Sequence, residues 1–413
     1  MTPPESGRRI LYVQYTNPAC YPPLERSAWI MATHGWSVHF LGTGSYGGNE
    51  LRLRSDPRIT EDRMPYCPEG WRQKFHYLRF CWRVLKTTLL WKPDWIYASD
   101  PLVTPVVALL SYCWPCQIIY HEHDSPNPPG RQGRGRAGAG RRALRARRLV
   151  ALRARLCVLP NAERAAQFSK EIGRRSGVLT VWNCPSLDEV APPKSSRHDE
   201  TFRILYHGSI VSPRLPLTVV RALSQLPETV RLGIAGYETV GQTGYVQELQ
   251  AIAAQLGIRD RIDWLGALPE RQQLLEQRRQ CDVGLAFMPK QSDDLNEQHM
   301  TGASNKPFDY LACGMGLLVS DRPDWVSLYV QPGYGLACDP EDPQSIADAL
   351  RWLLEHPAER RAMGERGRQR ILSAWNYEQQ FAPVLARIES GDAGPKNPRR
   401  APKWLQESMD RGG

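Results

Sequence analysis

A loop of small residues followed by a lysine and an aspartate is the segment of this 413-residue chain best suited to chemistry. The loop consists of Gly302, Ala303, Ser304 and Asn305. A helix is predicted to begin just after it, and a helix start leaves backbone N–H groups unpaired and directed at one spot. Those amides predict a phosphate site, to which Lys306 would add an ammonium group. Asp309, about one turn further on, would accept hydrogen bonds from vicinal ribose hydroxyls.

Two similar series of elements are predicted to position this loop. Residues 9–13 and 202–208 are apolar runs, and each is followed by a helical pattern and a second apolar run, at 37–41 and 230–235. Strand, helix and strand at this spacing form a right-handed βαβ unit. The pattern continues along both halves and predicts an α/β fold class with two tandem doubly wound (Rossmann-like) parallel-sheet domains. We expect ligand at the carboxyl ends of the strands, in the cleft that the domains face.

The expected domain boundaries follow from composition. Residues 185–200 are Pro-rich and polar, which is typical of a linker. The chain then divides into an N-terminal domain at 1–190, a linker at 191–200, a C-terminal domain at 201–375, a helix at 376–390 that can cross back to the N-terminal domain, and a polar tail at 391–413.

The sequence Asn-Lys-Pro-Phe-Asp-Tyr-Leu-Ala-Cys-Gly at 305–314, followed by an apolar strand and Ser-Asp, resembles the donor-binding segment of GT-B glycosyltransferases of the group 1 class. The resemblance extends over much of residues 202–375, with weaker matches in the N-terminal half. It implies transfer of a sugar, with retention of anomeric configuration, from a nucleotide-diphosphate sugar donor to an acceptor that the sequence does not identify. The donor would bind the C-terminal domain, and the acceptor would enter from the N-terminal domain.

The resemblance also implies how the donor pyrophosphate is held. Gly208 matches a glycine that precedes two basic residues in the family; Ser209 replaces the first of them, and Arg214 matches the second. Gly236 lies in a further family landmark. Because a departing nucleoside diphosphate gains negative charge, fixed cations near it stabilise the transition state. That task would fall to Arg214 and Lys306.

The acidic positions of the family pattern are only partly kept. Thr301 stands where the family has the acid that usually contacts the donor sugar, and Asp309 matches the second acid. No Asp-x-Asp occurs in a metal-binding context, so we predict no cofactor and no essential divalent metal. His123 is the candidate polar group beside the reacting carbon. Cys113 and Cys116 have the spacing of a redox or zinc pair, but they do not open a helix, which disfavours that interpretation.

Positive charge is concentrated in the first half of the chain. Residues 1–190 hold 27 Lys and Arg against 15 Asp and Glu, whereas residues 191–413 hold 26 against 28. Ten of the arginines lie from Arg131 to Arg155, and such a run suits an anionic membrane surface. A set of aromatic and apolar positions could add a shallow membrane contact: Trp71, Phe75, Tyr77, Leu78, Phe80, Trp82 and Leu85. No nucleic-acid recognition motif accompanies the charge.

The lack of a signal peptide and of a long apolar run predicts a cytoplasmic protein with reduced cysteines, placed at the inner face of a membrane if the basic run binds lipid. Two other functions stay open. A nucleotide-sugar epimerase of the same architecture would need acid and base carboxylates in the cleft. A degenerate sugar- or lipid-binding protein would explain Thr301 and Ser209.

Overall fold

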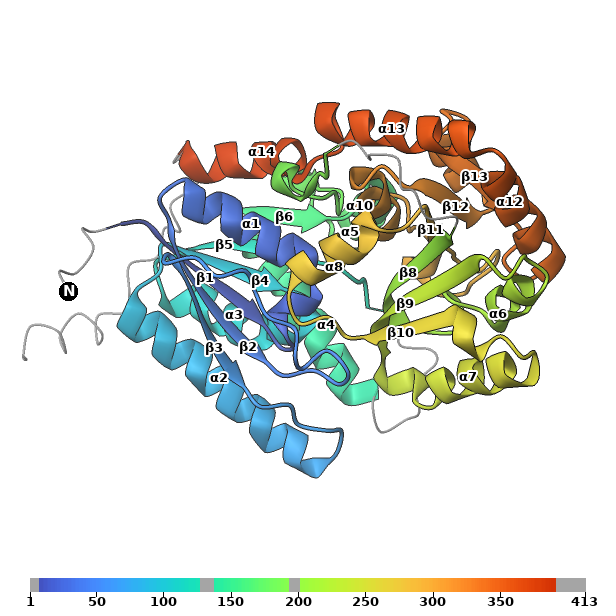
Figure 1. Ribbon diagram of the computed structural model, residues 1–413. Helices are drawn as coiled ribbons and strands as arrows, with labels where there is room; N and C mark the ends of the chain where they lie inside the picture. The colour runs from blue at the N-terminus through green and yellow to red at the C-terminus, as the bar shows by residue number, and fades with distance from the viewer. Residues whose placement is uncertain (1–6, 127–136, 193–200, 391–413) are drawn as a thin grey trace, which may run out of the picture.

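The computed structural model describes residues 7–126, 137–192 and 201–390, and it has two lobes (Figure 1). Each lobe holds one parallel β-sheet with helices on both faces, which confirms the expected α/β fold of two Rossmann-like domains. Parts of the expected linker and the whole expected tail, at 193–200 and 391–413, lie outside the described residues. Among the helices that are described, none is long and apolar enough to cross a membrane.

The N-terminal lobe is built on a seven-stranded sheet in the order β3-β2-β1-β4-β5-β6-β7. The strands are β1 (Arg9–Gln14), β2 (Ser37–Thr43), β3 (Ile59–Met64), β4 (Trp95–Ser99), β5 (Gln117–His121), β6 (Leu156–Leu159) and β7 (Val178–Thr180). Every pairing is parallel. The order reverses at β1, so the carboxyl end of β1 lies at the switch point where this class of sheet binds ligands.

The C-terminal lobe repeats this plan with six parallel strands in the order β10-β9-β8-β11-β12-β13. They are β8 (Phe202–Ile210), β9 (Val230–Glu238), β10 (Ile262–Gly266), β11 (Val283–Ala286), β12 (Gly316–Ser320) and β13 (Gly335–Cys338). Here the switch point falls at β8. The predicted first strand of each half is therefore central in its sheet.

Helices cover both faces of each sheet. They are α1 (Pro22–Thr33), α2 (Trp71–Trp91), α3 (Thr104–Cys113), α4 (Ala137–Arg153), α5 (Ala162–Ile172), α6 (Leu217–Ser224), α7 (Tyr245–Gln255), α8 (Arg271–Arg279), α9 (Leu295–Gln298), α10 (Lys306–Ala312), α11 (Pro323–Trp325), α12 (Pro343–Glu355), α13 (Pro357–Ser373) and α14 (Tyr377–Glu389). Short helical turns lie at η1 (Pro18–Cys20), η2 (Pro101–Val103), η3 (Leu187–Glu189), η4 (Val240–Gln242), η5 (Arg259–Arg261) and η6 (Val326–Val330).

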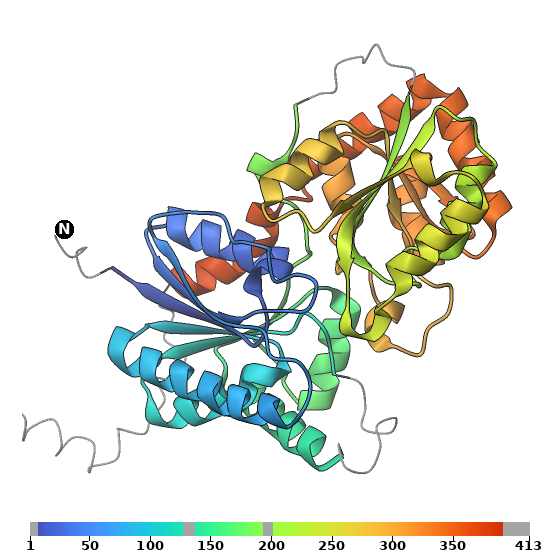
Figure 2. The same cartoon turned by 60° about the horizontal axis from the view of Figure 1, so that its bottom comes forward.

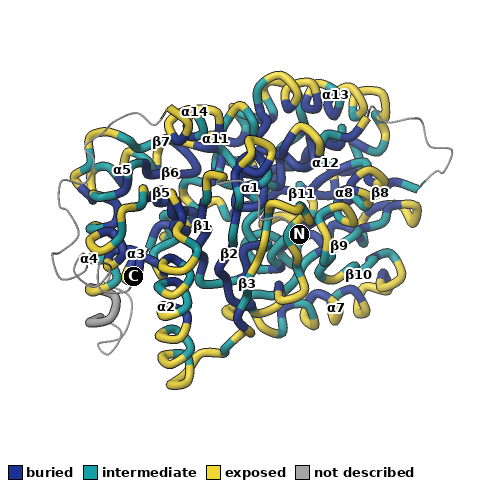
Figure 3. Tube along the Cα trace, turned by 90° about the vertical axis from the view of Figure 1, so that its left-hand side faces the viewer, coloured by how far each residue is buried: buried dark blue, intermediate teal, exposed yellow. Residues whose placement is uncertain are grey.

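Strand alternation divides the core of the N-terminal lobe into two layers. Leu11 and Val13 of β1 face the layer with α2, α3 and α4, whereas Ile10 and Tyr12 face the layer with α1 and α14. This is the two-residue period of a strand buried on both faces. Figure 2 shows α2 on the opposite side of the sheet from α1, and Figure 3 shows the strands as the buried centre of the molecule.

The last described helix returns to the first lobe. Tyr377 and Phe381 of α14 are fully buried beside α1, and the Tyr377 hydroxyl donates to the carbonyl of Pro23 at 3.0 Å. Because α14 follows the last helix of the C-terminal lobe directly, this packing ties the two lobes together a second time, in addition to the segment that joins β7 to β8.

Candidate functional site

A cavity of about 500 Å³ lies between the lobes, where the carboxyl ends of strands from both sheets meet. The residues that follow β1 and β2 line it from the N-terminal lobe, and the ends of β8 and β9 line it from the C-terminal lobe. The lobes touch at its rim, where the amide of Arg52 donates to the carbonyl of Pro269 at 2.9 Å. The structure therefore places the cavity at the expected topological position.

Lys306 reaches this cavity from the first turn of α10 beneath the end of β8. A Cβ at Gly208 would lie 3.2 Å from Cε and 3.3 Å from Nζ of Lys306, and a Cβ at Gly236 would overlap the carbonyl oxygen of Gly208. Gly208 also has a φ of 107°, which favours glycine. Both glycines line the cavity and are needed for the close approach of the two strand ends to the lysine.

Arg214 lines the same cavity and completes a pair of cations with Lys306. The Lys306 side chain is only 7% exposed, and Nε of Arg214 is buried without a hydrogen-bond partner among the described residues. Burial lowers the pKa of Lys306 to about 7, and repulsion by Arg214 adds to the shift. A bound anion would offset the electrostatic repulsion between these two cations. Ser209 lies on the same wall.

We expect the affinity for a nucleoside diphosphate to fall as the pH rises above about 7. A bound diphosphate favours the charged form of Lys306, so binding above this pH must take up a proton and weakens by up to about tenfold per pH unit. Calorimetric titrations in buffers of different ionisation enthalpy measure that uptake. The control is Lys306→Arg, whose guanidinium stays charged and should show none. An equal affinity at about pH 7 and pH 9 in the unaltered protein would contradict this assignment.

The small-residue loop before Lys306 does not form the expected cradle of amides. The N–H groups of Ala303 and Ser304 both donate to the carbonyl of Met300 at 3.0 Å, so they are not available to a phosphate. Only Asn305 of this loop lines the cavity. The expectation that these two amides would bind a phosphate is therefore wrong, and the cations near the cavity are side chains.

The same loop instead forms part of the contact between the lobes. Gly302, with a φ of 75°, lies so close to Trp182 that a Cβ would come within 2.7 Å of its ring. The side chain of Asn183 donates to the carbonyl of Ala303 at 2.6 Å. Thr301 also points away from the cavity, because its hydroxyl donates to Asp324 at 2.7 Å.

Asp309 is fully buried and does not line the cavity. Its Oδ1 accepts from Arg26 of α1 at 2.9 Å and from Arg271 of α8 at 3.0 Å. Its Oδ2 accepts from Asn305 at 2.9 Å and lies 3.5 Å from Nη1 of Arg278. Burial would raise the pKa of this carboxyl, but the arginines outweigh it and hold the pKa well below its usual range. In this structure the expected contact with ribose hydroxyls is replaced by a cluster of cations.

This cluster joins three parts of the chain. Arg26 belongs to the N-terminal lobe, Arg271 to the C-terminal lobe, and both also bind Glu189 in the segment between the lobes. Arg26 is 283 residues from Asp309, so no spacing in the sequence indicates the contact. Arg271 lines the cavity as well, which makes the cluster part of its floor.

His123 does not line the cavity but packs against Tyr21, which does. Their ring centroids are 5.0 Å apart, and the ring of His121 lies 3.8 Å behind. Burial, with a further contribution from Arg164, lowers the pKa of His123 to about 3, so the imidazole is neutral. Its Nε2 is buried without a hydrogen-bond partner in the described part of the chain.

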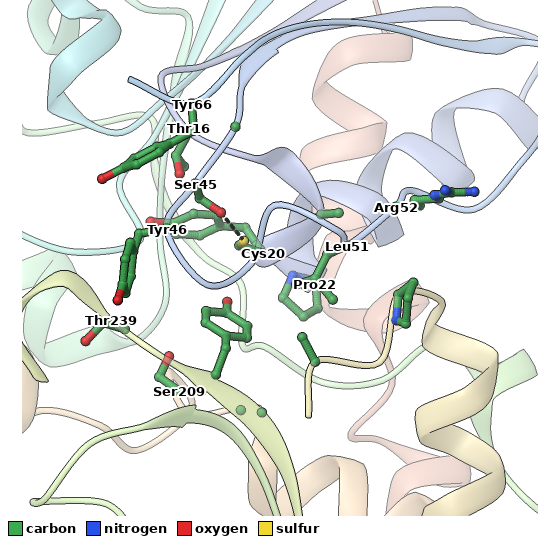
Figure 4. Close-up of a pocket in the computed structure, with 18 of the residues that line it drawn as sticks. Thr16, Cys20, Pro22, Ser45, Tyr46, Leu51, Arg52, Tyr66, Ser209 and Thr239 are labelled. Carbon is green, nitrogen blue, oxygen red and sulfur yellow. Dashed lines mark hydrogen bonds between the residues drawn. The ribbon is translucent and has the colours of Figure 1, made fainter. Parts of the chain in front are cut away.

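The opposite wall of the cavity was not anticipated from the sequence. It is rich in hydroxyl groups and aromatic rings, among them Tyr15, Thr16, Tyr21, Ser45, Tyr46 and Tyr66. Figure 4 shows Ser45, Tyr46 and Tyr66 across the cavity from Ser209 and Thr239. Tyr15 and Ser45 come just after β1 and β2, so the rule that ligands bind at strand ends is the signal by which the sequence would have indicated them.

Other expectations concern metal and lipid. The described residues hold no group of three or more His, Cys, Asp or Glu side chains that could bind a metal ion. Within the basic run, residues 131–136 lie outside the described residues. Arg147 is buried, not solvated, because its guanidinium binds Glu122 at 2.6 and 2.7 Å and Glu171 at 3.1 Å. That part of the run is structural.

Two parallel-sheet lobes around a cation-lined cavity at the strand ends define the GT-B class of proteins. Two family models agree: "Glycosyl transferases group 1" matches residues 188–370, and "Glycosyl transferase 4-like domain" matches residues 26–184. The C-terminal lobe therefore matches the group 1 glycosyltransferases and the N-terminal lobe a glycosyltransferase 4-like domain, so both lobes match domains of glycosyltransferase enzymes, as the resemblance implied.

Known relatives extend this comparison. A D-inositol 3-phosphate glycosyltransferase of Xylanimonas cellulosilytica is 30% identical over 182 residues, which is 44% of this chain and 40% of the relative's length. The structure of sucrose-phosphate synthase from Thermosynechococcus elongatus has a TM-score of 0.69 at 14% identity, and covers 93% of this chain and 100% of that one. Anabaena Alr3699/HepE in complex with UDP and glucose has a TM-score of 0.65 at 15% identity, with 93% and 100% covered. The two structural matches show that this chain shares the fold of those proteins.

Proposed function

We propose that this protein transfers a glycosyl group from a nucleoside-diphosphate sugar to an acceptor. The observation that carries the proposal is the pair of Lys306 and Arg214 in one interlobe cavity. The matches of both lobes to glycosyltransferase domains support it, as do the complexes of the similarly folded HepE with UDP and with UDP-glucose. The donor would lie with its diphosphate against the ends of β8 and β9, and the acceptor against the hydroxyl-rich wall.

The chemistry follows from the charges in the cavity. Breaking the bond between sugar and phosphate places negative charge on the departing diphosphate, and the buried Lys306 and its neighbour Arg214 stabilise that charge. Two carboxylates, Glu25 and Asp124, are among the described residues that line the cavity. We propose retention of anomeric configuration on the family resemblance, and His123 as a neutral group that orients Tyr21 near the reacting carbon.

We further propose that the cations replace a divalent metal at the phosphates. Donor turnover should then stay within about twofold of its value after treatment with a chelator. Incubation with a panel of nucleotide sugars, without acceptor, should give slow hydrolysis of one donor, and nuclear magnetic resonance of the first product should show the retained anomer. Loss of turnover on chelation, restored by Mg²⁺ or Mn²⁺, would reject the metal-free mechanism.

The same incubation separates the other two functions. An epimerase would convert the donor into its epimer, with Glu25 and Asp124 as the carboxylates available in the cavity. A degenerate binding protein would bind nucleotide and turn over nothing; the hydrogen bond between Thr301 and Asp324 is the observation that favours it, because it takes the sugar-contacting position of the family out of the cavity. Donor hydrolysis without epimer supports the transferase over both.

The acceptor is the least defined part of the proposal. The wall that would receive it offers hydroxyls and aromatic rings, which suit a sugar or another polyhydroxylated group. We retain an anionic membrane as the proposed partner on this side, but not through Arg147, which is committed to Glu122. Three other arginines in the described part of the run are exposed and stay available for such a contact: Arg142, Arg145 and Arg148.

A further inference from the structure

Helix α2 carries a row of large hydrophobic side chains that nothing in the described structure covers. The row follows one side of the helix, at steps of three or four residues up to Trp82 and of two turns to Leu89, and each side chain is more than half exposed: Trp71 (68%), Phe75 (64%), Leu78 (63%), Trp82 (64%) and Leu89 (51%). Leu90, beside the row, is 71% exposed. Scattered exposed leucines are ordinary, but a contiguous row with two tryptophans marks an interaction surface.

This row is not the core-facing side of the helix. The buried residues of α2 are Phe80, Val84 and Thr88, which pack on the sheet from the opposite side. The expectation from sequence had placed Phe80 in the outward set, and the structure corrects it. Figure 3 shows exposed residues recurring along the outer side of α2. The helix therefore has two apolar faces, of which the fold uses one.

The charge of α2 has one sign. Its 21 residues include five basic side chains and no acidic one: Arg72, Lys74, Arg79, Arg83 and Lys86. Four of these are exposed, and Arg83 is partly engaged by Asp62 at 3.5 Å. An apolar row with aromatic residues, flanked by basic residues, is typical of a helix that lies in the interface of an anionic bilayer.

The helices next to α2 extend the same surface. α3 packs beside α2, and α4 packs beside α3. α3 exposes Leu109 (52%) and Tyr112 (57%), and α4 exposes Leu152 (48%). Figure 2 shows the three helices on one face of the N-terminal lobe. The surface is therefore wider than one helix and belongs to a single lobe.

The first turns of α2 connect this surface to the cavity. Gln73 and His76 line the cavity on the acceptor side, and Nδ1 of His76 lies 3.0 Å from the hydroxyl of Tyr15. Trp71 and Phe75 come from the same turns but point outward. If this face lies on a membrane, a substrate anchored in that membrane has to pass only the first turns of α2 to enter the cavity.

We propose that α2 seats the N-terminal lobe on an anionic lipid bilayer, with Trp71, Phe75, Leu78 and Trp82 in the interface, so that the acceptor of the transfer is carried by the membrane. The part about the acceptor rests on the proposed function, whereas the bilayer contact does not. A protein partner or a second copy would bury the same apolar row, but it would have to supply several carboxylates opposite the basic residues. A bilayer of anionic headgroups supplies that charge without further requirement.

The test is binding of the full chain to vesicles of phosphatidylglycerol and phosphatidylcholine in equal amounts. Binding should be at least about tenfold weaker on pure phosphatidylcholine and in high salt. Phe75→Ser/Trp82→Ser should weaken binding at least about tenfold, and Arg79→Gln/Lys86→Gln should weaken it only on the anionic vesicles. The matched control is Leu256→Ser/Leu372→Ser, which alters two exposed leucines of the C-terminal lobe and should bind unchanged.

The outcomes separate this proposal from the proposed function. An unchanged thermal unfolding transition shows that each variant is folded. Vesicle binding without donor turnover would support the bilayer contact and reject the transferase. Absence of vesicle binding would overturn the bilayer contact. So would sedimentation as a dimer that Phe75→Ser/Trp82→Ser dissociates, or cross-links between α2 and residues 391–413.

Discussion

Replacing Lys306 by alanine should lower donor turnover by about 10²- to 10³-fold and weaken the binding of nucleoside diphosphate. The ammonium group is buried beneath Gly208 and shares the cavity with Arg214, so the variant removes one of the two cations proposed to hold the diphosphate. Steady-state kinetics with the donor found in the panel, together with calorimetry for the diphosphate, measure both effects.

The matched control for this prediction is Lys290→Ala. Lys290 is exposed on the same lobe and binds Asp321 and Asp339 at 3.1 and 2.7 Å, away from the cavity. It should leave turnover unchanged. Lys306→Arg should recover part of the activity, because the charge returns in a larger group that must fit against Gly208. An unchanged affinity of Lys306→Ala for the diphosphate would remove this lysine from the site.

Asp309→Asn should destabilise the protein by about 3–5 kcal/mol, as expected when one partner of a buried ion pair is removed. The variant leaves Arg26, Arg271 and Arg278 buried close to one another without the carboxylate that they surround. Differential scanning calorimetry should show a lower transition temperature. Asp339→Asn makes the same change at an exposed ion pair, and should cost less than about 1 kcal/mol.

The stabilisation by Asp309 should also depend on pH. Because the folded pKa lies well below the ordinary value of about 4, the contribution is complete above that pH and is lost progressively as the pH falls below it. The stability of the Asn variant should not show that loss. Adding Arg26→Met to Asp309→Asn should recover stability, since it removes one unpaired cation. Equal stabilities of Asp309→Asn and the unaltered protein would show that the cluster does not hold the lobes together.

The cluster changes how the acidic position of the family pattern is understood in this chain. The prediction that Asp309 binds ribose hydroxyls followed from its place about one turn after the loop, and the resemblance separately matched it to the second acid of the family pattern. In the structure it binds arginines from both lobes, and Arg271 among them lines the cavity. Asp309 thus binds one arginine that lines the cavity, Arg271, and one that comes from the other lobe, Arg26.

Local sequence determined much of this protein. Apolar runs of four to seven residues at regular spacing predicted parallel strands, because a strand buried on both faces needs apolar residues throughout. Lys306 was found because it follows a small-residue loop at a predicted helix start. Gly208, Gly236 and Arg214 were found from the family resemblance, and all four residues line the cavity.

Only the tertiary structure decided which side chains meet. The contact of Arg26 with Asp309 spans 283 residues, and no periodicity or local motif reports a contact of that length. The N–H groups of Ala303 and Ser304, before Lys306, donate to the carbonyl of Met300, because the backbone forms a turn there. The backbone angles of that turn could not be read from the sequence. The structure also decided which apolar residues of α2 are buried. Phe80 and Trp82 are both large and apolar, and only packing against the sheet shows that Phe80 is buried and Trp82 exposed.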